Sequence, residues 1–241
     1  MPKAVAAAVL IAAAATAGCA RDRSESAGPV VERNFAVGAF DSIEMAGAYD
    51  VTVRTGAAPS VHAKGGEKML ERLVVEVEGN RLKIHPRERR GFNWGSGRSS
   101  KVELTITVPS LRSAELAGAG GIRIDRVTGD SFNGGIAGSG DLRIDSVEVG
   151  SLKFGIAGSG GATAGAGRAK TVEFEIAGSG DIDARGVAAE TANVSIAGSG
   201  NVAANAARDA KVSIMGSGDV EITGGAKCTI QKGGSGNVRC S

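Results

Sequence analysis

Acidic and amide residues recur at a regular interval in the second half of the chain, directly after glycine-rich turns. They are Asp141, Asp181, Asn201, Asp219 and Asn237, with Gly161 at the equivalent position between the first two. Oxygen ligands beside glycine turns build calcium sites in β-rolls, where repeats of about nine residues let successive turns share one ion. Here the interval is close to twenty residues. We therefore expect these side chains to close turns through nearby backbone groups, rather than to bind a metal.

Two Arg-x-Asp pairs form a second candidate, Arg123 with Asp125 and Arg143 with Asp145. Carboxylates stacked one strand spacing apart could serve polysaccharide cleavage. The alternative is a solvated face on which each arginine lies between aspartates. The repeats carry no long insertion that would wall a substrate cleft, which favours the solvated face. We expect no catalytic residue here.

Other catalytic and binding classes find little support. The turn serines Ser139, Ser159, Ser179 and Ser199 have no histidine partner, because the chain holds only His62 and His85. No helix follows the Gly-x-Gly turns to receive a phosphate. A net charge of +2 and 3% aromatic residues give no platform for nucleic acid. We expect no cofactor, no metal and no nucleic-acid partner.

Two of the three cysteines, Cys228 and Cys240, lie twelve residues apart near the end of the sequence. An exported chain meets an oxidising compartment, so a disulfide is the leading interpretation. A metal site is the alternative, but neither histidine lies near this pair in the sequence. We expect the disulfide to close the last part of the fold.

A repeated sequence motif, Ile-Ala-Gly-Ser-Gly, indicates the elements that position these residues. It occupies 136–140, 156–160, 176–180 and 196–200, with degenerate copies at 116–120, 214–218 and 232–236. The last glycines are separated by steps of 20, 20, 20, 20, 18 and 18 residues. A fixed period of this length indicates a solenoid.

Within each period, three short alternating runs are joined by glycine and serine corners. Sliding the sequence by one period aligns like residues, such as Phe154 with Phe174 and Ile156 with Ile176. Like residues stacked coil upon coil fill the core of a parallel β-helix. The same alignment places Cys228 and Cys240 at inward positions of the terminal coil. We therefore assign 117–241 to an all-β parallel solenoid with coils of about 18–20 residues.

The first half, 33–116, is also strand-rich and is expected to continue into the solenoid. The run from Ile43 to Arg54 alternates apolar and polar residues, as does the run from Val102 to Val108. Between strands, the segment 86–100 has no apolar period and is expected to be an exposed loop. Its Phe92 and Trp94 lie among arginines, where they could bind a partner or could fold back onto the core.

The amino terminus, 1–19, has the pattern of an export signal. Lys3 precedes an apolar run that is too short to span a membrane, and Ala17-Gly18-Cys19 follows. These residues fit a bacterial lipoprotein signal in which Cys19 becomes the lipidated first residue, although Thr16 departs from the usual Leu or Val. The alternative is ordinary signal cleavage near Ala15 to Ala17. Residues 20–32 are small and polar and are expected to form a flexible tether.

Taken together, these features resemble the bacterial head GIN domain family, a domain of unknown function whose name describes an auto-transporter adhesin. The resemblance runs from about Phe35 to Val238. It rests on Phe40-Asp-Ser-Ile43 leading into Tyr49-Asp-Val51, on the strand from Val102 to Pro109, and on the Gly-Ser-Gly repeats. It implies a right-handed β-helix exported to the cell envelope, and it supplies no catalytic residues.

The function that the sequence favours is non-catalytic: an exported, lipid-anchored β-helix that faces the periplasm or the cell surface and acts as an adhesin or scaffold. Its expected partners are the membrane, through the anchor, and an unidentified protein or glycan. Two alternatives remain open. One is a polysaccharide-acting lyase or hydrolase, and the other is a regulatory partner of an envelope signalling system.

The lipoprotein assignment predicts that Cys19→Ala will release the protein from membranes, because the acyl chains provide the anchoring free energy. Fractionation of cells that express wild type or Cys19→Ala checks this. A variant that stays in the membrane fraction would contradict the assignment.

Overall fold

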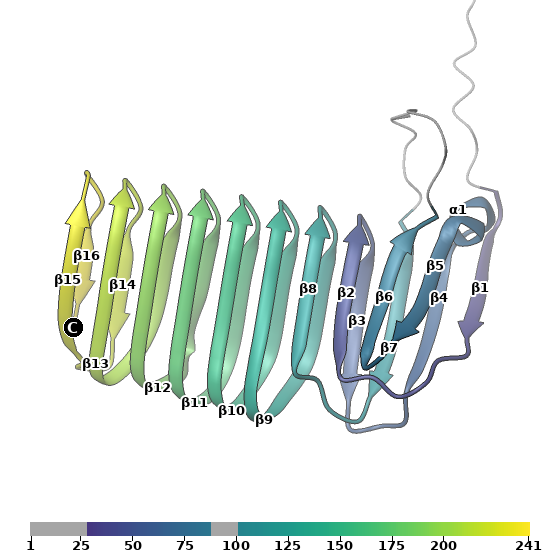
Figure 1. The fold of residues 1–241 in the computed structure, drawn as a ribbon, viewed down its shortest axis with the longest axis horizontal. Helices are drawn as coiled ribbons and strands as arrows, with labels where there is room; N and C mark the ends of the chain where they lie inside the picture. Colours follow the sequence, from purple (N-terminus) through teal and green to yellow (C-terminus); the bar gives the residue numbers. More distant parts are fainter. Residues whose placement is uncertain (1–27, 88–100) are drawn as a thin grey trace, which may run out of the picture.

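The computed structural model describes residues 28–87 and 101–241 as a parallel β-solenoid of about six turns. One sheet of sixteen strands runs through this part of the chain, and a single short helix lies at its amino-terminal end (Figure 1). The all-β parallel solenoid expected from the repeats is confirmed. Among the described residues no charged or polar side chain is buried, so the core is formed by apolar side chains.

Five coils form the regular part of the solenoid, and each is a nearly continuous strand that bends around the core. They are β9 (Gly121–Gly138), β10 (Asp141–Gly158), β11 (Gly161–Gly178), β12 (Asp181–Gly198) and β13 (Asn201–Gly216). Each coil pairs in parallel with the next, and Phe154 faces Phe174 while Ile156 faces Ile176. The predicted columns of like residues are therefore present in the predicted register.

The interior of the coils is narrow and is filled by these columns. Phe154 and Phe174 are fully buried, and their rings stack with centroids 5.7 Å apart. The column has no ring in the preceding coil because Gly134 stands there. A Cβ on Gly134 would lie 2.7 Å from Cδ1 of Phe154, so this glycine makes room for the phenylalanine. The core therefore holds a large aromatic pair only where a neighbouring position is empty.

The corners of the coils depend on the first glycine of each Gly-Ser-Gly. Gly158 has a φ of 133°, in the region that favours glycine, and a Cβ there would overlap the carbonyl oxygen of Gly138 in the coil before. The next amide continues the ladder, because Ser159 N donates to that same oxygen at 2.9 Å. The absent side chain thus lets two corners approach closely enough to hydrogen-bond.

Strands of the amino-terminal half pair with the first strands of the solenoid and continue its stack. Strands β2 (Ser42–Gly47) and β3 (Asp50–Thr55) form a corner that stacks beneath the corner between β8 (Ser113–Gly118) and β9. On their other side they pair with β6 (Arg81–Pro86) and β7 (Glu103–Val108). The run from Ile43 to Arg54 is therefore two strands on two faces, rather than one continuous strand.

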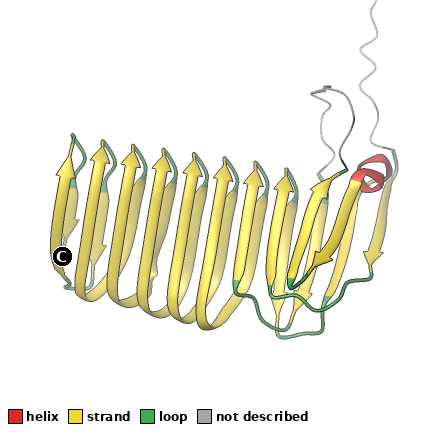
Figure 2. Cartoon of the chain, in the orientation of Figure 1, coloured by secondary structure: helices red, strands yellow, loops and turns green. Residues whose placement is uncertain are grey.

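Antiparallel strands close the amino-terminal end. They are β1 (Val30–Phe35), β4 (Ser60–Gly66) and β5 (Leu73–Glu78), with the helix α1 (Glu67–Arg72) between the last two (Figure 2). The hairpin from β5 to β6 turns at Gly79-Asn80, where Gly79 has a φ of 63°. Strand β1 begins at Val30, inside the segment 20–32 that was expected to be a tether.

The last coil is formed by β14 (Val220–Thr223), β15 (Lys227–Gly233) and β16 (Val238–Cys240), and the predicted disulfide joins Cys228 to Cys240. Cys240 occupies the inward column of Ile222, as expected. It is nevertheless exposed, because β16 is the edge strand of the described sheet. The disulfide therefore ties together the two strands of an open end.

The corner geometry predicts opposite effects for two neighbouring glycines. Gly158→Ala should lower the free energy of unfolding by at least about 2 kcal/mol, because the new Cβ combines positive φ with a backbone overlap. Gly155→Ala should be neutral or raise it by up to about 1 kcal/mol, since a Cβ at Gly155 meets no atom within 4 Å. Urea denaturation followed by circular dichroism checks both. Equal destabilisation by the two variants would contradict this account.

Removal of the disulfide should lower the stability of the last coil and leave that of the distant coils unchanged. The double variant Cys228→Ser, Cys240→Ser should lose about 3 kcal/mol in the last coil, the chain-entropy value for a loop of this size. Amide hydrogen exchange should accelerate in β15 and β16 and remain slow in β10 and β11, because distant coils share no contact with the cross-link. Uniform acceleration through all coils would count against a local role.

Candidate functional site

The Asp and Asn column after the turns acts as a hydrogen-bond ladder. Asp181 Oδ1 accepts from the backbone N of Asn201 at 3.0 Å and from its Nδ2 at 2.9 Å. Asp219 Oδ1 accepts from Asn237 in the same way, at 2.8 and 3.1 Å. These bonds run to the following coil, whereas the sequence predicted bonds to backbone within the same turn. Within 28–87 and 101–241, no group of three or more His, Cys, Asp or Glu residues could hold a metal ion.

The Arg-x-Asp pairs form a network of exposed ion pairs. Asp145 lies between two arginines and accepts from Arg123 Nη2 at 2.9 Å and from Arg143 Nε at 3.1 Å. Asp125 instead accepts from the backbone N of Thr55 at 3.0 Å. One aspartate thus lies between two arginines, whereas the sequence predicted each arginine between aspartates, and the other aspartate bonds the backbone.

The two histidines lie on different strands, His62 on β4 and His85 on β6, and each is partly exposed. His62 Nδ1 lies 2.7 Å from Asn34 Oδ1, and His85 Nε2 lies 3.3 Å from Glu76 Oε1. Phe92 and Trp94, the predicted partner-binding residues, lie outside the described residues, and so does Cys19. Those three assignments remain predictions.

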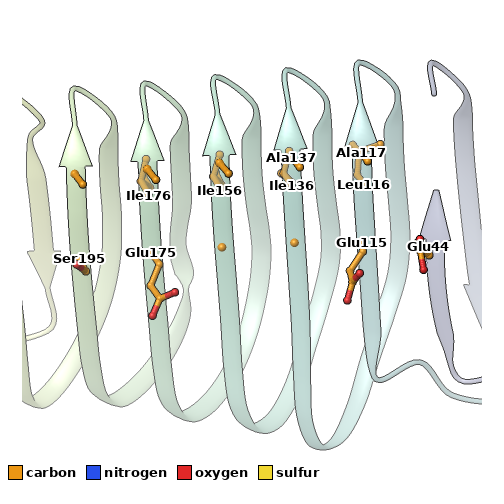
Figure 3. Close-up of a pocket in the computed structure, with 15 residues that line it drawn as sticks. Glu44, Glu115, Leu116, Ala117, Ile136, Ala137, Ile156, Glu175, Ile176 and Ser195 are labelled. Carbon is orange, nitrogen blue, oxygen red and sulfur yellow. The ribbon is translucent and has the colours of Figure 1, made fainter. Parts of the chain in front are cut away.

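A recess that the sequence analysis did not identify lies on one outer face of the solenoid, across β2, β8 and β9–β12 (Figure 3). Its volume is about 600 Å³, within the range of ligand pockets. Its lining combines carboxylates with alanines, glycines, one serine and four buried aliphatic residues of the core. The lining residues are Glu44, Glu115, Leu116, Ala117, Gly135, Ile136, Ala137, Gly155, Ile156, Ala157, Glu175, Ile176, Ala177, Ser195 and Ala197.

Two glycines on neighbouring strands form the floor of this recess. Gly135 and Gly155 share one outward column with Glu115 on one side and Glu175 on the other. Figure 3 shows these two glutamates flanking the two strands between them. Because the glycine positions carry no side chain, the surface is hollow where neighbouring coils project a glutamate.

The fold does not require glycine at either position. Neither Gly135 nor Gly155 has a positive φ. A Cβ on Gly135 would make only an ordinary 3.5 Å contact with Cγ of Glu115, and one on Gly155 would meet nothing within 4 Å. A glycine within a strand weakens it and often marks a place where a ligand or another backbone approaches closely. These two glycines therefore differ from those of the corners.

The charges around the recess are unevenly distributed. Lys153 Nζ donates to Glu173 Oε1 at 3.1 Å and to Glu175 Oε1 at 3.2 Å, and these bonds raise the pKa of the lysine. At the other end, Glu44 Oε2 lies 3.0 Å from Nη1 of Arg81. Glu115, in register with Glu44, is half-buried and has no ion pair or hydrogen bond from its side chain to any residue that the structure describes. Glu115 is thus the carboxylate of the recess that no described cation compensates.

A signal for this recess is present in the sequence. The outward column reads Glu, Gly, Gly, Glu and Ser at 115, 135, 155, 175 and 195. Two glycines at non-corner positions interrupt a column of polar side chains. The 20-residue period places them on neighbouring coils, but only the backbone angles and the surrounding atoms show that no turn needs them.

The described residues contain no helix that is long and apolar enough to cross a membrane.

Comparison with known proteins gives one family and several solved structures. The profile of the family described as "Putative auto-transporter adhesin, head GIN domain" matches residues 39–226. No curated protein matches the chain.

Among solved structures, the chain is similar to a putative adhesin from Bacteroides fragilis, with 20% identity, a TM-score of 0.79, and coverage of 88% of this chain and 97% of that one. It is similar to a putative lipid binding protein from Parabacteroides distasonis, with 25% identity, a TM-score of 0.73, and coverage of 89% and 97%. A putative adhesin from Parabacteroides merdae has 18% identity, a TM-score of 0.68, and coverage of 89% and 97%.

Proposed function

Since this chain belongs to the family described as "Putative auto-transporter adhesin, head GIN domain", we propose that it is a non-catalytic binding module of the cell surface. Its ligand occupies the recess across β2, β8 and β9–β12. The observation that carries the proposal is the pair Gly135 and Gly155, which hollow the surface where neither backbone conformation nor packing requires a glycine.

The chemistry of the lining supports binding without catalysis. Among the described residues that line the recess, Ser195 is the only one with a hydroxyl group, and none is a histidine, cysteine or lysine. Nucleophilic catalysis needs a base within hydrogen-bond reach of the nucleophile. Glu44 and Glu175 are already held in ion pairs with cations. A rigid β-face of this kind is suited to holding a partner, because backbone pairing fixes every position of the lining.

A lipid anchor at Cys19 would orient the solenoid relative to the membrane. Cys19 precedes Gly28, the first described residue, by nine positions, and an extended chain of that length spans at most about 30 Å. The folded part begins beside α1 and β1, at the end opposite to the disulfide (Figure 1). The anchor would therefore hold the antiparallel end near the membrane, with the repeated coils extending from it.

A lipid is the second candidate for the ligand. It is favoured by the apolar part of the lining, where Ala117, Ala137, Ala157, Ala177 and Ala197 form one edge of the recess. The Parabacteroides distasonis protein, 25% identical, is itself described as a putative lipid binding protein. Binding to vesicles distinguishes this candidate from a protein or glycan ligand.

The proposal predicts that filling the floor will abolish recognition. Gly155→Leu should reduce binding of the labelled full-length protein to intact cells or to a glycan array by at least about tenfold, since a leucine would occupy the hollow. Its stability should be unchanged, because the new side chain points into open space.

Ser213→Leu is the matched control. Ser213 lies in the same outward column, one coil beyond Ser195, and is not part of the recess lining. Its variant adds a leucine to the same face and should bind like wild type. If Gly155→Leu also binds like wild type, the recess is not the binding site.

A further inference from the structure

We propose that the recess recognises a basic side chain, lysine or arginine, presented by an extended segment of a partner protein. This inference rests on the proposed function and names the chemistry of its ligand. It identifies Glu115 as the carboxylate that pairs with the incoming cation, and Gly135 and Gly155 as the floor that receives the aliphatic part of the side chain.

Charge is the first argument. Three glutamates line the recess, Glu44, Glu115 and Glu175, and each of the outer two has a cation of the chain beside it. Glu115 has none among the described residues. Its half-buried carboxylate is less screened than a fully exposed one, so an arriving cation gains more there than at a fully exposed carboxylate.

The position of the Glu115 side chain is the second argument. A Cβ on Gly135 would lie 3.5 Å from Cγ of Glu115, so this side chain leans over the neighbouring strand and borders the hollow. The outward residue beside Gly135 at this end is Asn133, which is uncharged. The lysine beside Gly155, Lys153, is held at the opposite end by Glu173 and Glu175. No described cation therefore competes for Glu115.

The lining of the floor is the third argument. Long basic side chains lay their apolar stems along apolar surface and keep the charged group at a polar site. The backbone of Gly135 and Gly155 and the methyl groups of Ala137 and Ala157 offer such a surface next to Glu115. An anionic lipid headgroup or phosphate would meet three carboxylates instead. A sugar would find no aromatic ring in the lining on which to stack.

The spacing of the carboxylates indicates how the partner lies. Glu115 and Glu175 are separated by three strand spacings, or about 14 Å. In an extended peptide, residues four positions apart are also about 14 Å apart and project to one side. A segment that lies along the solenoid axis can therefore present one basic residue to Glu115 and another toward Glu175.

The test uses fluorescence anisotropy with the full-length protein and a labelled peptide, Lys-Ala-Gly-Ala-Lys, at low salt. The matched peptide Gln-Ala-Gly-Ala-Gln has the same length without the charges. We expect the lysine peptide to bind, and Glu115→Gln to weaken it about fivefold, the upper range for a partly exposed ion pair. Binding should also fall as salt rises, because the pair is partly screened.

Glu103→Gln is the control for loss of one charge. Glu103 is an exposed residue of β7 on another face, outside the recess lining. Its variant should bind the lysine peptide like wild type. Circular dichroism and urea midpoints of both variants should match wild type, which separates a lost ligand contact from a damaged fold.

Several outcomes would overturn the inference: no binding of the lysine peptide, equal binding of the glutamine peptide, or no effect of Glu115→Gln. Binding to phosphatidylglycerol vesicles that Gly155→Leu abolishes and Glu115→Gln does not weaken would also overturn it, in favour of a lipid. The proposed function stands if Gly155→Leu alone abolishes cell or glycan binding. It fails if that variant binds like wild type, whatever the peptide does.

Discussion

Parallel backbone pairing between one coil and the next is the constraint on which the rest of this structure depends. The pairing fixes successive strands at about 4.8 Å, and it must continue through the corners for the coils to stay in register. At each corner a Cβ would overlap the carbonyl of the coil before, as at Gly158 above Gly138. Glycine is therefore the residue that lets the ladder continue through the Gly-Ser-Gly corners. The Gly-Ser-Gly motif recurs in the sequence because every such corner has this steric requirement.

The same constraint shapes the interior and the two ends. Each inward residue sits on the equivalent residue of its neighbour, so the core is a set of columns in which Phe154 and Phe174 stack at 5.7 Å. A stack of this kind has open ends, and exposed strand edges invite further pairing. Antiparallel strands and α1 close one end. At the other end, the disulfide and Lys232 interrupt the apolar core. Lys232 replaces the isoleucine of its column and donates to Gly236 O at 2.8 Å.

Departures from the repeat carry the functional information, because the repeat itself is explained by the fold. The acids after the turns bond the following coil, and the aspartates of the Arg-x-Asp pairs hold arginines or backbone. Gly135 and Gly155 have no such explanation. They remove two side chains from a polar column and leave Glu115 beside a hollow, without a partner among the residues that the structure describes. A surface built by repetition displays a site most clearly where one column is interrupted.

The sequence by itself determined the class of fold, the register of the coils and the pairing of Cys228 with Cys240. These follow from local rules, since each coil contacts mainly its neighbours and a fixed period states which residues meet. Only the tertiary structure decided how Ile43 to Arg54 divides into β2 and β3 and inserts between β6–β7 and β8–β9. The 20-residue period does not relate these segments, although Ser42–Gly47 and its partner Ser113–Gly118 are similar in sequence. The tertiary structure also decided which glycines the backbone needs and which it does not. A glycine looks the same in a sequence whether it turns a corner or opens a recess, and only the φ angle and the neighbouring atoms distinguish them.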